Sequence, residues 1–277
     1  MKISEAISYG THEIEYFNTK LLLEKIFNCK DNYLVINNDK EMTIEQENYF
    51  KNLVKAVKAG EPVQYITNKQ EFYDCEFYVD ENVLIPQQDT SFIVYKALTI
   101  LYNMDLDRPI RILDLCTGSG AIAIVISKKL NERNIDFEMS ATDISNGALN
   151  VAIKNASKII PDTKVNFILS DLFDKVEGQF DMIISNPPYV RSNDIEKLNL
   201  DVQNEPHIAL DGGMDGLKFY RQISEHIDEY LVDGGYLVLE IDYDQGKKVS
   251  DLLDNSTFYK DLNMNDRCVI YQKIIDK

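Results

Sequence analysis

The chain has 277 residues, of which 44% are hydrophobic and 27% charged, and these proportions are ordinary for a globular protein. Its 29 Lys and Arg residues are outnumbered by 46 Asp and Glu residues, which gives a net charge of −17. This acidity excludes the broad basic face that binding to a nucleic-acid backbone requires, so we expect no direct contact with DNA or RNA. The length suits one large domain, or a small domain followed by a medium one.

The four cysteines are far apart in the sequence and form no C-x-x-C pair, which argues against a zinc site or a disulfide framework and suits a reducing cytosol. The first residues, MKISEAISYGTHEIEYFN, contain no apolar core of a signal peptide. No stretch approaches the roughly 18 consecutive apolar residues of a membrane span. We therefore expect a soluble, cytoplasmic monomer that binds neither a membrane nor a metal.

The first 60 residues predict helices separated by polar breaks, because apolar side chains recur at helical spacing between Tyr16 and Phe27. The stretch NLVKAVKAG ends in Gly60, a residue suited to the C-terminus of a helix. Alternating apolar residues then predict a β-hairpin, with YDC and DEN as its turns. The alternating residues are Phe72, Phe77, Val79 and Val83 to Ile85.

From residue 90 the pattern becomes one of alternating strands and helices, which predicts βαβ units around a mostly parallel, seven-stranded sheet. Strands are expected at residues 111–116, 137–145, 165–173, 180–185, 235–242, 258–263 and 268–275. Helices are expected at residues 91–103, 121–130, 146–159, 217–231 and 244–254. The chain is thus an α/β protein with a helical part before its sheet.

A glycine-rich turn follows the first of these strands, in RILDLCTGSGAIAI, and opens a helix. Gly118 and Gly120 allow a tight turn and a close approach of the backbone to a ligand. Asp114 stands at the end of this strand, and Asp143 at the end of the next, where its carboxylate can accept hydrogen bonds from both hydroxyls of a ribose. A phosphate-binding P-loop is not expected, because no Lys follows the glycines.

The end of the third strand, at SDLF, places Asp171 and Leu172 where they can flank an adenine ring. Carboxyl ends of parallel strands meet at one edge of such a sheet, and ligands bind there. These residues therefore predict a pocket for an adenosine-containing cofactor. NAD is the competing ligand, although the gap from the turn to Asp143 is longer than the roughly 20 residues of the dinucleotide fingerprint.

The fourth strand ends in Asn186, Pro187, Pro188 and Tyr189, at the same edge of the sheet. The prolines restrict their own backbone and that of the residue before them, so the carbonyls of Asn186 and Pro187 point in fixed directions. An amide oxygen, a fixed carbonyl and an aromatic ring can together hold a planar NH2 group, whose delocalised lone pair makes it a poor nucleophile. An ordinary proline turn is the alternative interpretation.

Together the two motifs resemble those of class I S-adenosylmethionine-dependent methyltransferases that modify planar nitrogens. The resemblance implies a Rossmann-like fold, S-adenosylmethionine as methyl donor, S-adenosylhomocysteine as product and no metal. DNA and RNA amino-methyltransferases share the NPPY sequence, so this motif alone does not choose the substrate.

Further segments indicate the substrate. Several separated motifs resemble, in the same order, those of the protein-(glutamine-N5) methyltransferases of peptide chain release factors. The resemblance runs from about residue 60 to the C-terminus. It implies methylation of a glutamine in the GGQ motif of release factors, which would be the protein substrate. The segments that carry it are EPVQYITNKQEFYDCEFYVDENVLIPQQDT, NEPHIALDGGMDGLKFYRQI, LVLEIDYDQGKKV and YKDLNMNDRCVIYQK.

The resemblance also implies a division of the chain and a set of site residues. Residues 1–70 form a helical substrate-recognition domain, 71–89 a β-hairpin linker and 90–277 the methyltransferase domain. Asn186, Pro187 and Tyr189 are the expected catalytic residues, and with Pro188 they bind the substrate glutamine. The donor is expected to contact Asp114, Cys116, Thr117, Gly118, Ser119, Gly120, Asp143, Asp171, Leu172 and Asn186.

The sequence departs from the family pattern in two places. Where relatives usually read P-R-P-[DE]-T-E, this chain has Pro86-Gln87-Gln88-Asp89-Thr90-Ser91, and we assign that segment no catalytic role. Cys116 lies where relatives often have Gly, and we expect it to have the negative φ that a small side chain tolerates. Asp211 to Gly213 are expected to form a turn, within a segment from Glu205 to Gly216 that can close over the site.

Three alternatives remain open at this point. A related enzyme class methylates a glutamine of a ribosomal protein, although the pair Asp89-Thr90 favours the release-factor branch. A DNA or RNA amino-methyltransferase needs a basic groove and a target-recognition region, and the sequence shows neither. A methyltransferase fold that serves only as a binding module is disfavoured by the intact Asp114, Asp143 and NPPY.

Overall fold

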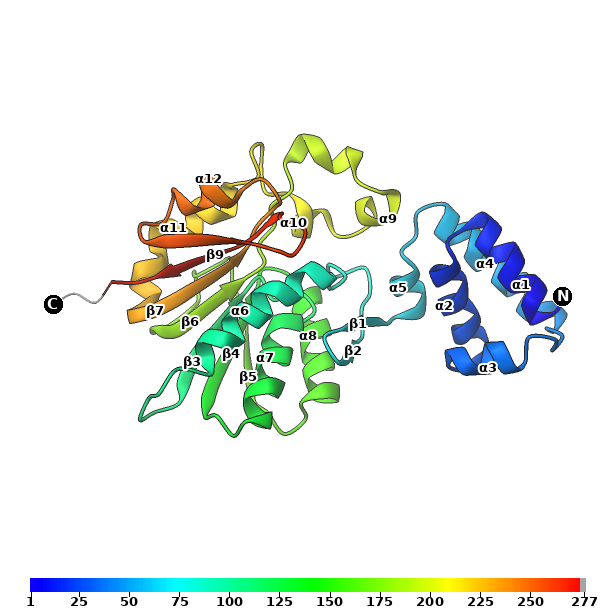
Figure 1. Ribbon diagram of the computed structural model, residues 1–277, viewed down its shortest axis with the longest axis horizontal. Coiled ribbons are helices and arrows are strands. Elements are labelled where there is room, and N and C mark those ends of the chain that lie inside the picture. The colour runs from blue at the N-terminus through cyan, green and yellow to red at the C-terminus, as the bar shows by residue number, and fades with distance from the viewer. Residues whose placement is uncertain (275–277) are drawn as a thin grey trace. The chain divides into compact units, whose positions relative to one another are not determined.

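The computed structural model describes residues 1–274, which form two compact units. The helical unit comprises Met1–Lys69 together with Lys197–Glu205, and the sheet unit comprises Gln70–Glu196 together with the chain from Pro206 onward. The chain therefore passes between the units three times, after residues 69, 196 and 205. Each unit is described separately (Figure 1).

The helical unit buries an apolar core contributed by its first, second and fourth helices, with Ile3, Leu22, Leu23, Phe50 and Val54 almost fully buried. Gly60 follows the fourth helix with φ +100°, which confirms the expected glycine at this helix end. The side-chain amide of Asn204, in the returning segment, donates a hydrogen bond of 2.8 Å to the carbonyl of Gly60. The helices are α1 (Ile3–Glu13), α2 (Tyr16–Phe27), α3 (Asp31–Ile36), α4 (Ile44–Lys58), α5 (Val63–Thr67) and α9 (Leu200–Gln203).

The sheet unit contains a seven-stranded sheet in the order β5-β4-β3-β6-β7-β9-β8. All neighbouring strands from β5 to β7 are parallel, whereas β9 is antiparallel to both β7 and β8. This confirms the mostly parallel α/β sheet that the sequence predicts. The strands are β3 (Ile110–Leu115), β4 (Phe137–Asp143), β5 (Val165–Leu169), β6 (Phe180–Ser185), β7 (Leu231–Glu240), β8 (Ser256–Lys260) and β9 (Asp266–Gln272).

Helices cover both faces of this sheet (Figure 1). On one face α6 (Ser91–Leu101), α7 (Ala121–Glu132) and α8 (Asn146–Ile159) pack on alternate strand residues such as Ile112 and Ile184. On the other face α11 (Lys218–Tyr230) and α12 (Gly246–Ser250) pack on the intervening residues, including Leu113 and Ile183. No helix in the described part of the chain has both the length and the apolar character needed to cross a lipid bilayer.

Some element boundaries differ from the expectation. The predicted hairpin is present as β1 (Gln70–Phe72) and β2 (Cys75–Phe77), but Val79 and Val83–Ile85 lie beyond it in irregular backbone. The helix expected at residues 244–254 is shortened to α12. Ile275, expected at the end of the last strand, lies outside the described residues. The short 3-10 helix η1 (Gln88–Thr90) and the short helix α10 (His207–Leu210) complete the unit. A second 3-10 helix, η2 (Ser192–Lys197), ends at the first residue of the segment that returns to the helical unit.

Asn155, fully buried on α8, fastens the irregular segment after the hairpin to the glycine-rich turn. Its side-chain oxygen accepts a hydrogen bond of 2.7 Å from the N–H of Tyr78, and its NH2 group donates to the carbonyls of Tyr78 and Ser119. One amide thus satisfies three backbone groups, which would cost free energy if they were withdrawn from water without a partner. The two chain segments that approach the sheet edge are held together by this contact.

Candidate functional site

A cleft of about 1260 Å³, measured with its open mouth, lies at the carboxyl ends of β3, β4, β5 and β6. Nine of the predicted site residues line it, namely Cys116, Thr117, Gly118, Ser119, Asp143, Asp171, Leu172, Asn186 and Pro188. Four others do not, namely Asp114, Gly120, Pro187 and Tyr189. The sheet therefore brings the two predicted motifs to one cavity, and some of their residues support it from behind.

Asp114 organises the loop after β3 and lies beneath the cleft. Its carboxylate is fully buried and accepts hydrogen bonds from the Thr117 hydroxyl (2.6 Å) and the Ala123 N–H (3.1 Å). Burial raises the pKa of Asp114 to about 7, although these two hydrogen bonds oppose the rise. The carboxyl group thus joins the glycine-rich turn to the first turn of α7.

The two glycines of this turn have different roles. Gly118 has φ +55°, and a Cβ atom built on it would meet no atom within 4 Å, so its backbone borders open space in the cleft. Gly120 has φ +82°, and a Cβ atom there would approach Ile124 to 2.9 Å and Ala152 to 3.2 Å. Gly118 is therefore free to approach a ligand, whereas Gly120 allows α7 and α8 to pack closely.

Cys116 corrects one expectation, because its φ is +60° rather than negative. The left-handed conformation strains residues other than Gly by about 1–2 kcal/mol, and this explains why Gly suits the position. Burial raises the pKa of the Cys116 thiol, and the nearby carboxylates of Asp143 and Asp114 raise it further. A neutral thiol beside the cleft is not a nucleophile.

Asp143 presents its carboxylate at the end of β4. Oδ2 accepts a hydrogen bond from the N–H of Gly118 (2.9 Å), and Oδ1 accepts one from the N–H of Ser145 (2.9 Å). Burial raises the pKa of Asp143, and these backbone N–H groups oppose the rise. Each oxygen keeps a further lone pair, so the fixed carboxylate can accept two more hydrogen bonds from a diol.

Apolar side chains flank this carboxylate in the cleft. Ile144 follows Asp143 directly and remains 51% exposed, while Leu172 and Ala148 line the same region. Leu172 has φ +42°, and the segment after β5 is held by the Ser170 hydroxyl, which donates to the Leu172 carbonyl (3.0 Å). Asp171 lines the cleft beside it. A polar anchor beside exposed apolar surface suits a ligand that combines a sugar with a flat ring.

Asn186 brings a side-chain amide into the cleft at the end of β6. Its NH2 group donates a hydrogen bond of 3.2 Å to the hydroxyl of Thr90, which is 5% exposed. Thr90 belongs to the segment Pro86–Ser91, to which the sequence assigned no catalytic role. The structure places Pro86, Gln87 and Thr90 of this segment in the lining of the cleft.

Tyr189 turns away from the cleft lining and packs against the second core of the sheet. Its hydroxyl donates a hydrogen bond of 3.3 Å to Glu240 Oε1, at the buried end of β7. Burial raises the pKa of Glu240 to about 7, while the Thr90 hydroxyl, the Arg267 charge and the Tyr189 hydroxyl lower it. The aromatic residue of the motif is therefore anchored by its hydroxyl to a buried carboxyl group.

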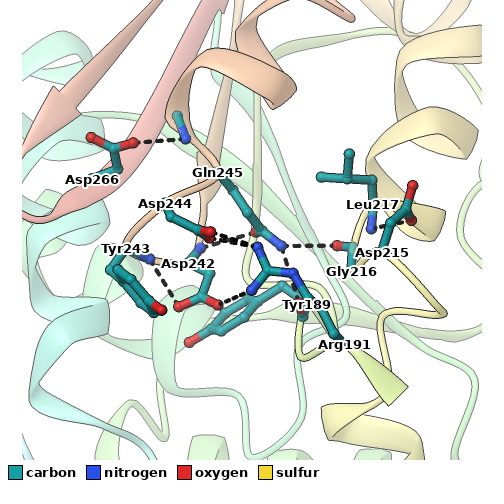
Figure 2. A network of polar contacts seen from close by, with 11 residues as sticks. Tyr189, Arg191, Asp215, Gly216, Leu217, Asp242, Tyr243, Asp244, Gln245 and Asp266 are labelled. Atoms are coloured by element: carbon teal, nitrogen blue, oxygen red, sulfur yellow. Dashed lines mark hydrogen bonds and ion pairs between the residues drawn. The ribbon is translucent and has the colours of Figure 1, made fainter. Parts of the chain in front are cut away.

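Gln245 holds the backbone of the same turn, as Figure 2 shows. This fully buried side chain donates to the carbonyls of Tyr189 (3.2 Å) and Gly216 (3.3 Å), and it accepts from the N–H of Asp242 (3.1 Å). Arg191, just after the turn, forms ion pairs with Asp244 (2.7 Å) and Asp242 (3.7 Å) in the same network. The chain leaving the NPPY turn is thus tied to the loop after β7.

The segment around Asp211 packs directly on this turn. Asp211 pairs with Val190 in a parallel bridge, and the N–H of Gly212 donates to the Val190 carbonyl (2.8 Å). A Cβ atom on Gly212 would lie 2.7 Å from the Tyr189 Cα, and one on Gly216 would lie 2.5 Å from the Tyr189 carbonyl oxygen. Asp211 thus lies in a β-bridge and the turn residues follow at Met214 and Asp215, so the expected turn at Asp211 to Gly213 is displaced along the chain. The absence of a side chain at Gly212 and Gly216 allows this segment to pack closely on the motif.

Several residues that line the cleft were not predicted from the sequence. They are Asn82, Val83, Leu84, Gln87, Thr90, Pro206, Ile208, Lys218, Phe219 and Gln222. Thr90 follows Asp89, and this Asp-Thr pair matches the family pattern P-R-P-[DE]-T-E. The match was the sequence signal that could have placed the segment at the cleft. Glu240 and Gln245 lie in LVLEIDYDQGKKV, but their buried contacts depend on the tertiary fold. Within residues 1–274, no cluster of three or more His, Cys, Asp or Glu side chains is arranged to hold a metal ion.

Comparisons with known proteins agree with this architecture. The sequence matches the Methyltransferase small domain family over residues 97–204 and the PrmC N-terminal domain family over residues 8–67. The solved structure of T. Thermophilus 16S rRNA N2 G1207 methyltransferase (RsmC), in complex with AdoMet and guanosine, aligns with a TM-score of 0.51 at 14% identity, covering 74% of this chain and 49% of that one. The fold is that of the class I S-adenosylmethionine-dependent methyltransferases.

Curated relatives narrow this class further. The chain is 37% identical to the release factor glutamine methyltransferase of Fusobacterium nucleatum subsp. nucleatum, covering 93% of this chain and 73% of that protein. It is 35% identical to the release factor glutamine methyltransferase of Clostridium acetobutylicum, covering 98% of both. The chain belongs to the release factor glutamine methyltransferase family.

Replacing Gln245 tests the network behind the NPPY turn. Gln245→Leu leaves two buried carbonyls and one N–H without their partner, at about 1–3 kcal/mol for each group that water cannot reach. We expect the free energy of unfolding, measured by urea denaturation, to fall by at least about 2 kcal/mol. Gln272→Leu, at an exposed position of β9, should lower it by less than about 1 kcal/mol. Equal losses for the two variants would show that the network does not hold the turn.

Proposed function

We propose that this chain transfers the methyl group of S-adenosylmethionine to the side-chain amide nitrogen, N5, of a glutamine in peptide chain release factors. One observation carries the proposal: a single cleft contains the Asp143 carboxylate on one side of β3 and the Asn186 amide on the other. The first suits the ribose of the donor, and the second suits the amide of the acceptor. The chain that carries both residues belongs to a family whose curated members are named release factor glutamine methyltransferases.

The residues present fit the donor. Asp143 keeps a lone pair on each oxygen after accepting from Gly118 and Ser145, as a ribose with two hydroxyls requires. The open space above Gly118 permits close approach of a bound molecule to the loop. Ile144 and Leu172 offer apolar surface for an adenine ring. When bound, S-adenosylmethionine supplies a methyl group activated by its attachment to a positively charged sulfur.

The acceptor amide needs orientation more than it needs a base. Its nitrogen lone pair is delocalised into the carbonyl, so it attacks only when its hydrogens are held and the lone pair is aimed at the methyl carbon. Asn186 offers its side-chain oxygen for one of these hydrogens, since its NH2 group is already bonded to Thr90. We assign the second acceptor to the carbonyl of Pro187, whose carbon is bonded to the nitrogen of the cleft-lining Pro188 and whose direction the rigid turn fixes.

The remaining residues of the NPPY motif support the residues that hold the acceptor amide. Pro188 lines the cleft, whereas Tyr189 is held behind it by Glu240 and Gln245. We infer that Tyr189 contributes by keeping the turn in place. The helical unit, residues 1–69 with 197–205, is the part we assign to contact with the release factor, consistent with its match to the PrmC N-terminal domain.

Incubation with purified bacterial release factor and isotopically labelled donor tests the function directly. We expect one methyl group on one glutamine of the release factor, located by mass mapping of its peptides. Purified ribosomal proteins and a DNA duplex, treated in the same way, serve as competing acceptors. Transfer to either of these, with an unmodified release factor, would contradict the proposal.

Asp143 should control donor binding. Asp143→Ala removes two charge-assisted hydrogen bonds to the ribose, each worth roughly 1.5–3 kcal/mol, so we expect donor affinity to fall more than about 100-fold. Asp143→Asn keeps one acceptor oxygen, so its donor affinity should fall less than that of Asp143→Ala. Titration calorimetry measures both, and circular dichroism confirms that the variants are folded. An unchanged affinity in Asp143→Ala would remove this residue from the donor pocket.

Asn186 should control the chemical step. Asn186→Ala removes one preorganised acceptor without disturbing the proline turn, and we expect the methylation rate to fall about 10²–10³-fold. Asn186→Asp still accepts a hydrogen bond and should retain part of the activity. Single-turnover measurements at saturating donor and release factor report this step, with Asn150→Ala, an exposed change on α8, as the control. If Asn186→Ala works at the wild-type rate, the proline motif is only a turn.

A further inference from the structure

The hairpin between β8 and β9 presents two apolar side chains to solvent at its tip. Leu262 is fully exposed, Met264 is 70% exposed, and Tyr243, in the loop after β7, is 60% exposed. The N–H of Asp266, at the start of β9, donates a hydrogen bond of 3.3 Å to the carbonyl of Tyr243, so the loop lies beside the hairpin. Exposed apolar side chains that gather in one region, unlike single ones, mark a contact surface.

Several contacts hold the tip of this hairpin in one shape. Asp261 Oδ1 accepts hydrogen bonds from the N–H groups of Asn263 (2.8 Å) and Asn265 (3.0 Å), and the Lys260 ammonium group donates to the carbonyl of Met264 (3.1 Å). Met264 has φ +65°, a conformation that is costly for residues other than Gly. The tip thus has little backbone freedom left to lose when a partner binds, and this preorganisation favours binding.

The tip lies at the edge of the sheet that carries the cleft. β9 is antiparallel to β7, with Cys268 opposite Glu240, so the start of β9 lies beside the carboxyl end of β7. β7 is in turn the neighbour of β6, at whose carboxyl end Asn186 lies. Asp143 follows β4, on the other side of β3. The hairpin is therefore on the side of the cleft that we assign to the acceptor.

Arg267 connects the tip to the wall of the cleft. Its guanidinium group forms ion pairs with Asp89 (3.1 Å) and with Asp261 (3.3 Å). Asp89 directly precedes Thr90, which lines the cleft and accepts the hydrogen bond from Asn186 (3.2 Å). A short series of contacts thus leads from the hairpin tip to Asn186. A protein whose glutamine reaches Asn186 has its adjoining surface close to the tip.

The surroundings of the tip are negatively charged. Their ion pairs join five carboxylates to three cationic side chains, and the exposed members are Asp89, Asp244 and Lys260, with 58%, 41% and 42% of their side chains accessible. A partner with positive charge beside its apolar side chains complements this surface. The carboxylates are Asp89, Asp242, Asp244, Asp261 and Asp266, and the cationic side chains are Arg191, Lys260 and Arg267.

We propose that the hairpin tip, residues 261–265, together with Tyr243, is a docking surface for the release factor beside its acceptor glutamine. The inference rests on the proposed function, because the release factor covers this surface only if it is the substrate. Leu262 and Met264 bury apolar surface of the partner, and the carboxylates around them attract Lys or Arg side chains next to it. The docking surface positions the substrate and takes no part in methyl transfer.

Removing the apolar side chains of the tip tests this role. The double variant Leu262→Ser, Met264→Ser keeps the hydrogen bonds that shape the tip, and we expect the KM for release factor to rise about 10-fold while kcat stays within about twofold of the wild type. Leu106→Ser is the matched control, since this exposed residue precedes β3 and therefore lies toward the opposite edge of the sheet. A wild-type KM in the double variant would overturn the proposal.

Binding measured without methyl transfer gives a second readout. With release factor immobilised and S-adenosylhomocysteine present, surface plasmon resonance should show about 10-fold weaker binding of the double variant and unchanged binding of Leu106→Ser. Titration calorimetry should give the same affinity for S-adenosylhomocysteine in all three proteins. Undiminished binding of release factor by the double variant, or an equal loss in Leu106→Ser, would refute the docking surface.

Two results distinguish this proposal from its rivals. In sedimentation velocity we expect wild type and double variant to have the same mass, whereas a wild-type dimer that dissociates in the double variant would assign the tip to a second copy of this chain and overturn the proposal. A wild-type protein that neither binds nor methylates release factor contradicts the proposed function itself. Normal methylation by the wild type, with unchanged KM and binding in the double variant, contradicts the docking surface alone.

Discussion

The burial of polar groups behind the NPPY turn is the constraint on which the site depends. A polar group removed from water costs free energy unless it finds a partner, so each buried donor or acceptor restricts the position of the group it meets. Glu240 and Gln245 are both withdrawn from solvent, and both make their side-chain hydrogen bonds to the turn or to the loops beside it. Movement of the turn would break several of these contacts together. The rigidity of the motif thus comes from the sheet behind it as well as from its prolines.

Under the proposed function, this arrangement separates two tasks at one sheet edge. The side proposed for the donor is built from backbone: the turn at Gly118 and the N–H groups that hold Asp143. The side proposed for the acceptor is built from side chains: Asn186 lines the cleft, and Tyr189 behind it donates to the buried carboxyl group of Glu240. A backbone cradle suits a cofactor that is the same in every reaction cycle.

The fold and the exposed half of the site could be predicted from sequence because their signals are local. Strand and helix periodicity, the turn at Gly118, the carboxylate of Asp143 and the amide of Asn186 each occupy a short stretch with a distinctive composition. The supporting half could not, because Thr90 and Asn186 are 96 positions apart, Tyr189 and Glu240 are 51 positions apart, and each pair meets only through the order of the strands. The left-handed backbone at Cys116 was also missed, since that conformation is imposed by the packing around the turn and not by the residue itself.

The three passages of the chain between the units affect how the protein is assembled during synthesis. Residues 1–69 leave the ribosome before the sheet unit does, and domains generally begin to fold in the order of synthesis. However, the helical unit also contains Lys197–Glu205, which the ribosome adds only after β3, β4, β5 and β6 have been made. Until then the carbonyl of Gly60 lacks the Asn204 amide that it accepts from in the finished protein. The helical unit is therefore completed only after the central strands of the sheet exist, although most of it is synthesised before them.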